Sequence, residues 1–204
     1  MNRAQKENIN TKQYWEKEYS RRITRGNFKI NRGLIVKIRQ NIQSDERIKT
    51  VLDIGCGVGT FVKDCLDKKY KARGIDISEQ SIRFAKNLYG KDNFRIADIT
   101  TLKLKQNSID CITSLEVIEH MEEPVVIINK LIEAAKYKVI ISVPMGNSIK
   151  SREHVWTFEP KDFEDLGFEV IIFNSARMIA IYNKQVTTLV KDEDIAKYQN
   201  KIYE

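Results

Sequence analysis

Residues 51–61 read VLDIGCGVGTF, and this stretch decides the fold class of the 204-residue chain. A short apolar run that contains one acid, Asp53, leads into three glycines at alternate positions, Gly55, Gly57 and Gly59. Short apolar runs of this kind are typical of buried strands, and glycines after a strand let bare amide groups approach a ligand. The stretch therefore predicts a strand, a ligand-binding turn and the start of a helix.

Outward from this stretch, short apolar runs alternate with longer amphipathic ones. Helices are predicted at 59–67, at 78–89 with Ser78 as the N-cap, and from Pro124 onward. Strands are predicted at 50–54, 71–75, 93–97, 108–114 and 138–143. Strands that alternate with helices indicate an α/β fold around a parallel sheet.

The last two strand-like runs, FEVIIFN and RMIAIYNK, are separated only by residues 175–176. A parallel crossover needs about a dozen residues or more, so these two strands should be antiparallel neighbours. The polar tail that follows can add a short helix near residues 192–203.

The composition, with 42% hydrophobic residues and only three prolines, is that of an ordered globular protein. Cys56, Cys65 and Cys111 fit neither a zinc motif nor a disulfide framework, which favours reduced thiols in a cytoplasm. The chain shows no signal-peptide pattern and no run of 18 apolar residues, so we expect a cytoplasmic protein without a membrane partner.

Positive charge is concentrated at the start of the chain. Residues 1–33 hold nine Lys and Arg against three Asp and Glu, a surplus of six out of the overall +7. We interpret this segment as a basic helical cap that packs on the domain through its aromatic residues, which are Tyr14, Trp15, Tyr19 and Phe28. The alternative is a surface for a nucleic-acid or phosphate-bearing partner.

Two acids frame the glycine turn. Asp76 ends the next strand, 21 residues after Gly55, where a carboxylate can accept hydrogen bonds from both hydroxyls of a ribose. Dinucleotide enzymes use a similar arrangement, but Asp53 would repel a pyrophosphate there and attract an ammonium group. The pattern therefore favours a nucleoside cofactor with a zwitterionic end, although each acid alone could merely cap a turn or a helix.

In their order along the chain, these motifs resemble the class I S-adenosylmethionine-dependent methyltransferases. VLDIGCGVGTF, GIDIS, RIADIT and IDCITSLEVIEHM match the four family motifs, and the resemblance covers roughly residues 14–184. It implies a Rossmann-like, seven-stranded, mostly parallel sheet with an antiparallel final strand and helices on both faces. Together with the charge pattern, it predicts a basic helical cap at 1–33, a methyltransferase domain at 34–184 and a polar tail at 185–204.

The resemblance assigns roles to single residues. It implies that the glycine turn holds the methionine portion of S-adenosylmethionine, that Asp76 binds its ribose, and that Asp98 contacts the adenine amino group. The full set of implied cofactor contacts is Asp53, Gly55, Cys56, Gly57, Gly59, Asp76, Ile77, Asp98, Ile99 and Leu115.

The candidate catalytic residues follow the predicted strand 108–114. In LEVIEHME, residues Glu116, Glu119 and His120 have the spacing of one face of a helical turn, and the loop that holds His154 should return to the same rim. Methyl transfer is an in-line displacement that needs alignment and, for a hydroxyl acceptor, a base. We predict His120 as that base or as an orienting group, with Glu119 and His154 beside it.

Two carboxylates and two imidazoles at one place could also hold a divalent metal ion such as Mn²⁺, Fe²⁺, Zn²⁺ or hydrated Mg²⁺. These residues resemble those of metal-assisted RNA ribose 2′-O-methyltransferases and of ubiquinone-type O-methyltransferases. The same Glu-His pair is frequent in methyltransferases with no established metal, so we favour a metal-free rim.

Trp156 and Phe158 either form an aromatic wall for a substrate or anchor their loop in the core, and we favour the second role.

The predicted function is S-adenosylmethionine-dependent O-methylation of a small metabolite. The alternatives are ribose methylation of RNA, suggested by the basic segment 1–33, and a catalytically inactive cofactor-binding partner subunit. The sequence identifies neither the methyl acceptor nor the oligomeric state.

Overall fold

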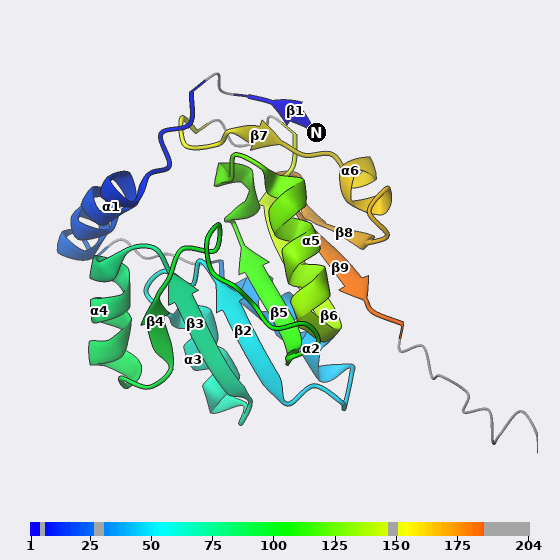
Figure 1. The fold of residues 1–204 in the computed structure, drawn as a ribbon, viewed down its shortest axis with the longest axis horizontal. Helices are drawn as coiled ribbons and strands as arrows, with labels where there is room; N and C mark the ends of the chain where they lie inside the picture. Colours follow the sequence, from blue (N-terminus) through cyan, green and yellow to red (C-terminus); the bar gives the residue numbers. More distant parts are fainter. Residues whose placement is uncertain (5–6, 27–30, 147–150, 186–204) are drawn as a thin grey trace, which may run out of the picture.

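A computed structural model describes residues 1–4, 7–26, 31–146 and 151–185 of the chain. A seven-stranded sheet with the order β4-β3-β2-β5-β6-β9-β8 forms its centre (Figure 1). Its strands are β2 (Thr50–Ile54), β3 (Lys71–Asp76), β4 (Phe94–Ile96), β5 (Ile109–Leu115), β6 (Ala135–Pro144), β8 (Glu169–Asn174) and β9 (Arg177–Asn183).

The direction of the strands confirms the predicted fold class. Strands β2 to β6 pair in parallel, whereas β9 is antiparallel to both of its neighbours, β6 and β8. The β8–β9 hairpin turns at 175–176, as its short connection requires. Consecutive residues of a strand point to opposite faces, so Val51 packs in one apolar cluster and Leu52 in the other.

Helices cover both faces of the sheet. The cluster on one face takes apolar residues from α2 (Arg32–Gln43), α3 (Thr60–Asp67) and α4 (Glu79–Tyr89). The cluster on the other face takes them from α5 (Pro124–Ala134) and α6 (Pro160–Glu164), and α5 crosses the front of the sheet in Figure 1. The three predicted helices correspond to α3, α4 and α5, and the prediction did not include α2.

The start of the chain crosses over the carboxyl ends of the parallel strands (Figure 1). Its short strand β1 (Asn2–Arg3) pairs antiparallel with β7 (Trp156–Thr157), and the helix α1 (Lys12–Thr24) follows. The predicted tail helix at 192–203 lies outside the described residues. Among the helices that the structure describes, none has the length and apolar character to cross a membrane.

Candidate active site

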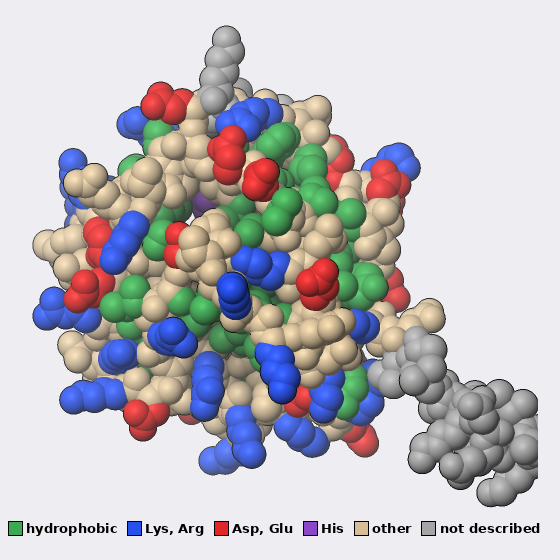
Figure 2. Space-filling view, viewed as in Figure 1, with side chains coloured by type: hydrophobic (Ala, Val, Ile, Leu, Met, Phe, Trp, Pro, Cys, Tyr) green, Lys and Arg blue, Asp and Glu red, His purple; other side chains and the backbone are tan. Residues whose placement is uncertain are grey.

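A cavity of about 690 Å³ opens at the carboxyl ends of the strands, a volume that suits a nucleoside-sized ligand. Its walls come from the ends of β2, β3, β5 and β9, from the 3₁₀ turn η1 (Ile118–His120), from residues 151–154 and from α1. In Figure 2, which has the same view as Figure 1, histidine is visible inside a recess of the surface. Ligands of open α/β sheets bind at this edge, so the cavity is the candidate active site.

The glycine turn forms one part of the cavity floor. Gly55, Gly57 and Gly59 have φ angles of 70°, 52° and 82°, which glycine adopts without strain. A Cβ on Gly55 would lie 2.4 Å from a methyl carbon of Val117, and one on Gly59 would lie 2.5 Å from the ring of Phe94. The turn therefore needs glycine both for its backbone angles and for its close packing.

The carboxylate of Asp53 lies at the end of β2 and is only 3% exposed. The hydroxyl of Thr113 donates a hydrogen bond of 2.7 Å to its Oδ1. Burial raises the pKa of Asp53 to about 7 even though this hydrogen bond lowers it. A cationic ligand group beside Asp53 would favour its ionised form, as expected for an ammonium site.

Asp76 ends β3 next to the glycine turn. Its Oδ2 accepts a hydrogen bond of 2.8 Å from the amide of Gly57, and its Oδ1 accepts one of 2.8 Å from the amide of Ser78. Burial raises its pKa above the ordinary value, against the effect of these two bonds. Each carboxylate oxygen can accept a further hydrogen bond, so Asp76 both fixes the turn and remains able to bind a hydroxyl pair.

The structure brings most of the predicted cofactor residues to one cavity. Those that line it are Asp53, Gly55, Cys56, Gly57, Asp76, Ile77, Asp98, Ile99 and Leu115. Gly59 does not line the cavity; it is the N-cap residue of α3, and a Cβ there would meet the ring of Phe94. Asp98 also fixes its own turn, since its Oδ1 accepts from the amide of Thr100.

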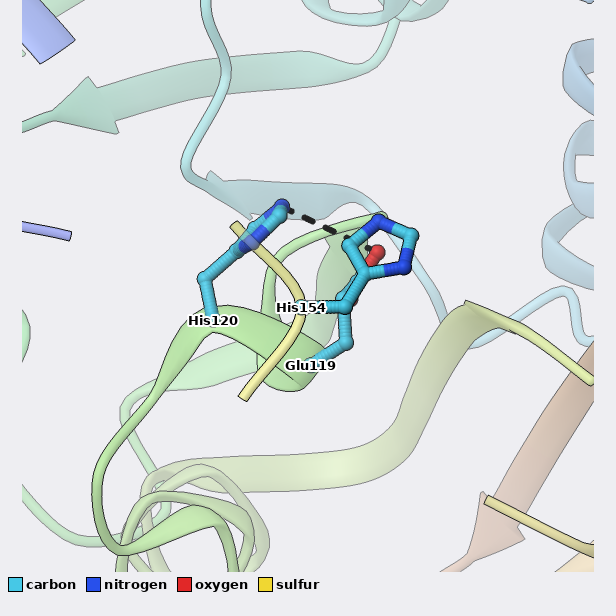
Figure 3. Close-up of side chains that lie close together, drawn as sticks. All are labelled: Glu119, His120 and His154. Atoms are coloured by element: carbon cyan, nitrogen blue, oxygen red, sulfur yellow. Dashed lines mark ion pairs between the residues drawn. The ribbon is translucent and has the colours of Figure 1, made fainter. Parts of the chain in front are cut away.

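At the other end of the cavity, η1 and the loop after residue 150 bring Glu119, His120 and His154 together (Figure 3). One possible ligand atom of each side chain lies within 4.8 Å of those of the other two. Nε2 of His120 is 3.9 Å from Oε1 of Glu119, and the two imidazole rings are 5.3 Å apart. The loop therefore returns His154 to the rim, as predicted.

The predicted position of Glu116 in this cluster is wrong. Its carboxylate instead accepts hydrogen bonds from the hydroxyl of Ser142 (3.1 Å) and from Nε of Arg177 (2.8 Å). Glu116 has a φ of 57°, and the helical turn begins only at Ile118. The helical spacing rule does not apply across this left-handed residue, so Glu116 lies outside the group formed by Glu119, His120 and His154, although it lines the same cavity.

The imidazole of His120 is held in one tautomer. Its Nδ1 lies 2.9 Å from the backbone oxygen of Glu153, which can only accept, so Nδ1 carries the proton. Nε2, with its lone pair, then faces Glu119 (Figure 3), and His120 lines the cavity. Burial lowers the pKa of His120 to about 4, so the ring is neutral near pH 7 and can accept a proton or bind a cation.

Glu119 is 1% exposed, and neither carboxylate oxygen has a hydrogen-bond partner among the described residues. Burial, with a smaller effect from the charge of Glu116, raises its pKa well above the ordinary value. A buried carboxyl without partners is protonated or faces a cation. One carboxylate and two imidazoles suit a divalent transition metal, so these residues fit such an ion.

The structure adds individual residues of the N-terminal segment to the site, which the sequence did not single out as site residues. Asn10 and Tyr14 donate hydrogen bonds to the backbone oxygen (2.7 Å) and the carboxylate (2.6 Å) of Glu153. The ring of Trp15 lies 5.0 Å from that of His120, edge to face. In the sequence, this contact is indicated by the aromatic residues within the basic segment 1–33.

Trp156 and Phe158 are not among the residues that line the cavity. The indole of Trp156 donates to the backbone oxygen of Met121 (3.0 Å), and Phe158 is 1% exposed and lies 5.3 Å from Phe163. Both therefore anchor the loop, as favoured in the sequence analysis.

Comparison with known proteins agrees with this geometry. Residues 52–140 match the methyltransferase domain family. Ubiquinone biosynthesis O-methyltransferase of Idiomarina loihiensis is 28% identical over 174 residues, which are 68% of this chain and 71% of that protein. Norajmaline N-methyltransferase of Rauvolfia serpentina is 31% identical over 104 residues, which are 47% of this chain but only 36% of that protein.

Among solved structures, magnesium protoporphyrin IX methyltransferase from Synechocystis with bound SAM superposes with a TM-score of 0.65. The superposition covers 91% of this chain and 100% of that one at 20% identity, a level that supports the shared fold alone.

Proposed function

We propose that the chain is a class I S-adenosylmethionine-dependent methyltransferase and that it transfers a methyl group from S-adenosylmethionine to an oxygen of a small metabolite. The observation that carries this proposal is a single cavity with acids suited to the cofactor at one end and a neutral imidazole at the other. The name of the Idiomarina loihiensis relative supports an oxygen acceptor.

In the proposed complex, the cofactor lies across the glycine turn. Its ammonium group pairs with Asp53, its ribose hydroxyls donate to Asp76, and its adenine lies between Ile77 and Ile99 near Asp98. These residues all line the cavity and lie at or just after the ends of neighbouring strands. This arrangement leaves the acceptor end, with Glu119, His120 and His154, for the methyl group and its acceptor.

In the proposed reaction, the acceptor oxygen attacks the methyl carbon in line with the carbon–sulfur bond. That bond breaks with its electron pair on sulfur, which gives S-adenosylhomocysteine, and the hydroxyl proton moves to Nε2 of His120. The Glu153 carbonyl keeps the lone pair of Nε2 turned to the cavity. Burial around His120 excludes water and strengthens the polar contacts at the reacting atoms.

A metal-assisted variant of this function is the second candidate, and the unpartnered oxygens of Glu119 favour it. Glu119, His120 and His154 would be the protein ligands. A divalent cation bound there would lower the pKa of an acceptor hydroxyl. His120 would then serve as a ligand rather than as the base, so added Mn²⁺ or a chelator distinguishes the two candidates.

The proposed partner is a small-molecule methyl acceptor. We also propose that the chain consists of a cap at 1–33, a methyltransferase domain at 34–184 and a tail at 185–204. An RNA acceptor remains the rival through the exposed cations of α1, which include Lys17, Arg21 and Arg25. It predicts RNA binding that weakens steeply with salt. Methylation of a small phenol without RNA retention at low salt would exclude it.

Incubation with S-adenosylmethionine labelled in its methyl group tests the proposal directly. The acceptors should be a panel of phenols, catechols and a metabolite extract, with and without Mn²⁺ and with a chelator. We expect label in a small hydroxyl compound and none after Asp76→Ala. Cofactor binding without label transfer to any acceptor would support the inactive partner subunit instead.

A further inference from the structure

A zwitterionic cofactor end needs two binding groups, and the floor of the cavity supplies only one of them. Asp53 suits the ammonium group, but Asp53 and Asp76 both repel the carboxylate beside it. The cations among the described residues that line the cavity are three arginines, Arg21, Arg22 and Arg177. The binding partner of the cofactor carboxylate should therefore be one of these three arginines.

Two of the arginines are poorly placed for this role. Arg21 uses both Nε and Nη2 on Glu18, at 2.9 and 2.6 Å, and its side chain is 51% exposed. Arg177 donates through Nε to Glu116 at the acceptor end of the cavity. Neither guanidinium is both free and next to the glycine turn.

Arg22 is better placed, because it lies beside Tyr19 and uses only its Nε in a hydrogen bond with the described residues. Its Nε donates to Glu18 at 2.7 Å, and no other hydrogen bond of its guanidinium joins it to the described residues. Its central carbon lies 5.8 Å from the ring centre of Tyr19 and 5.9 Å from that of Trp15. The two rings and Glu18 hold the group in place, and its terminal amino groups are left to bind an anion.

Tyr19 connects this arginine to the glycine turn. Its hydroxyl oxygen lies 2.6 Å from the position that a Cβ on Gly57 would occupy, so the phenol rests on the bare face of the turn. Burial raises the pKa of this hydroxyl well above its ordinary value, so it stays protonated and can donate.

We propose that Tyr19 and Arg22 bind the carboxylate of the cofactor's amino-acid end and thereby complete a site that Asp53 begins. This inference rests on the proposed function, because it takes S-adenosylmethionine as the ligand. It makes α1 a functional part of the cofactor site rather than a cover. Helix α1 is held there by Glu16, whose carboxylate accepts from the amides of Glu79 (2.5 Å) and Gln80 (3.0 Å) at the start of α4.

Calorimetry with two ligands tests the proposal. S-adenosylhomocysteine carries the carboxylate, and decarboxylated S-adenosylhomocysteine keeps the adenosine, the sulfur and the amine. Arg22→Gln should weaken binding of the first ligand about 10- to 100-fold and of the second less than twofold, because only the first offers a charge-assisted hydrogen bond. Tyr19→Phe should weaken the first ligand about three- to tenfold.

The controls use the same helix. Arg25→Gln, at an exposed residue that caps α1, should leave both affinities unchanged, and Arg22→Lys should keep most of the affinity for S-adenosylhomocysteine. Equal weakening of both ligands by Arg22→Gln would overturn the proposal, because it would indicate displacement of α1. So would equal affinity of the unmodified protein for both ligands, or tighter binding by Tyr19→Phe. Failure of the unmodified protein to bind either ligand would instead refute the proposed function.

Discussion

The floor of the cavity consists of strand ends and the glycine turn, whereas its roof consists of residues 8–25 and the loop 151–155. In the floor, contacts join the ends of neighbouring strands and the turns that follow them, such as Asp76 at the end of β3 with Gly57 after β2. In the roof, contacts join segments far apart in the chain, such as Tyr14 with Glu153 and Glu16 with Gln80. The floor is therefore part of the folded core, and the roof is docked on it through a few side chains.

This difference separates two kinds of experimental effect. Substitutions in the floor should change global stability or cofactor binding, since its residues are packed or hydrogen-bonded within the sheet. Substitutions in the roof should change the docking of α1 and leave the core folded. His120 lies where the two regions meet, between Trp15 of the roof and Glu119, its neighbour in η1.

The largest expected effect is on the reaction itself. His120→Ala should reduce methyl transfer about 10²- to 10⁴-fold, because it removes the proposed proton acceptor. The affinity for S-adenosylhomocysteine should change little. Single-turnover rates measure the effect, and a variant that transfers the methyl group at the normal rate would exclude His120 as the base.

The pH dependence of stability tests the floor at Asp53. The pKa of Asp53 is about 7 in the folded protein and lies near 4 in the unfolded chain, so between these values the folded state holds more protons. Its contribution to stability is therefore complete at pH 4 and is lost as the pH rises to 7, by about 4 kcal/mol at most.

Asp53→Asn should flatten this decline, because the amide does not titrate and its oxygen can still accept from Thr113. Urea unfolding of both proteins at several pH values between 4 and 8 gives the comparison. Identical slopes for the two proteins would contradict the raised pKa.

The glycine turn should be intolerant of a methyl group. Gly59→Ala should lower the free energy of unfolding by about 3 kcal/mol. Alanine is strained in the left-handed conformation of this residue, and its Cβ would clash with the ring of Phe94. Gly26 also has a positive φ, but nothing lies within 4 Å of its Cβ position. Gly26→Ala should therefore cost only about 1 kcal/mol, and an equal loss for both variants would exclude the clash.

The smallest expected effect concerns the docking of the roof. Glu16→Ala removes the acceptor for the first amides of α4 and should cost about 1 kcal/mol, as for other caps. Hydrogen exchange in α1 should become faster while the sheet amides stay protected. Lys17→Ala on the exposed side of α1 is the control, and equal exchange in both variants would argue against docking through Glu16.

The sequence predicted the floor better than the roof for a physical reason. Strands, glycine turns and the Ser78 cap depend on local patterns, so α3, α4 and the strands lie close to their predicted positions. The contacts of Tyr19 and Asn10 depend on where distant segments meet, which no local pattern encodes.

Glu116 and Gly59 show where a local pattern is insufficient. The left-handed φ of Glu116 breaks the helical spacing expected from the sequence. Gly59 stays a predicted cofactor contact, but it does not line the cavity, and a Cβ there would meet the ring of Phe94.

The central claim is that the floor binds S-adenosylmethionine through the carboxylate at the end of β3. The most direct measurement is calorimetric titration of the unmodified protein and of Asp76→Ala with S-adenosylhomocysteine, with thermal unfolding to show that the variant is folded. The account predicts one binding site per chain and an affinity at least tenfold lower in the variant. Binding of equal strength in both proteins, or no binding to the unmodified protein, would contradict it.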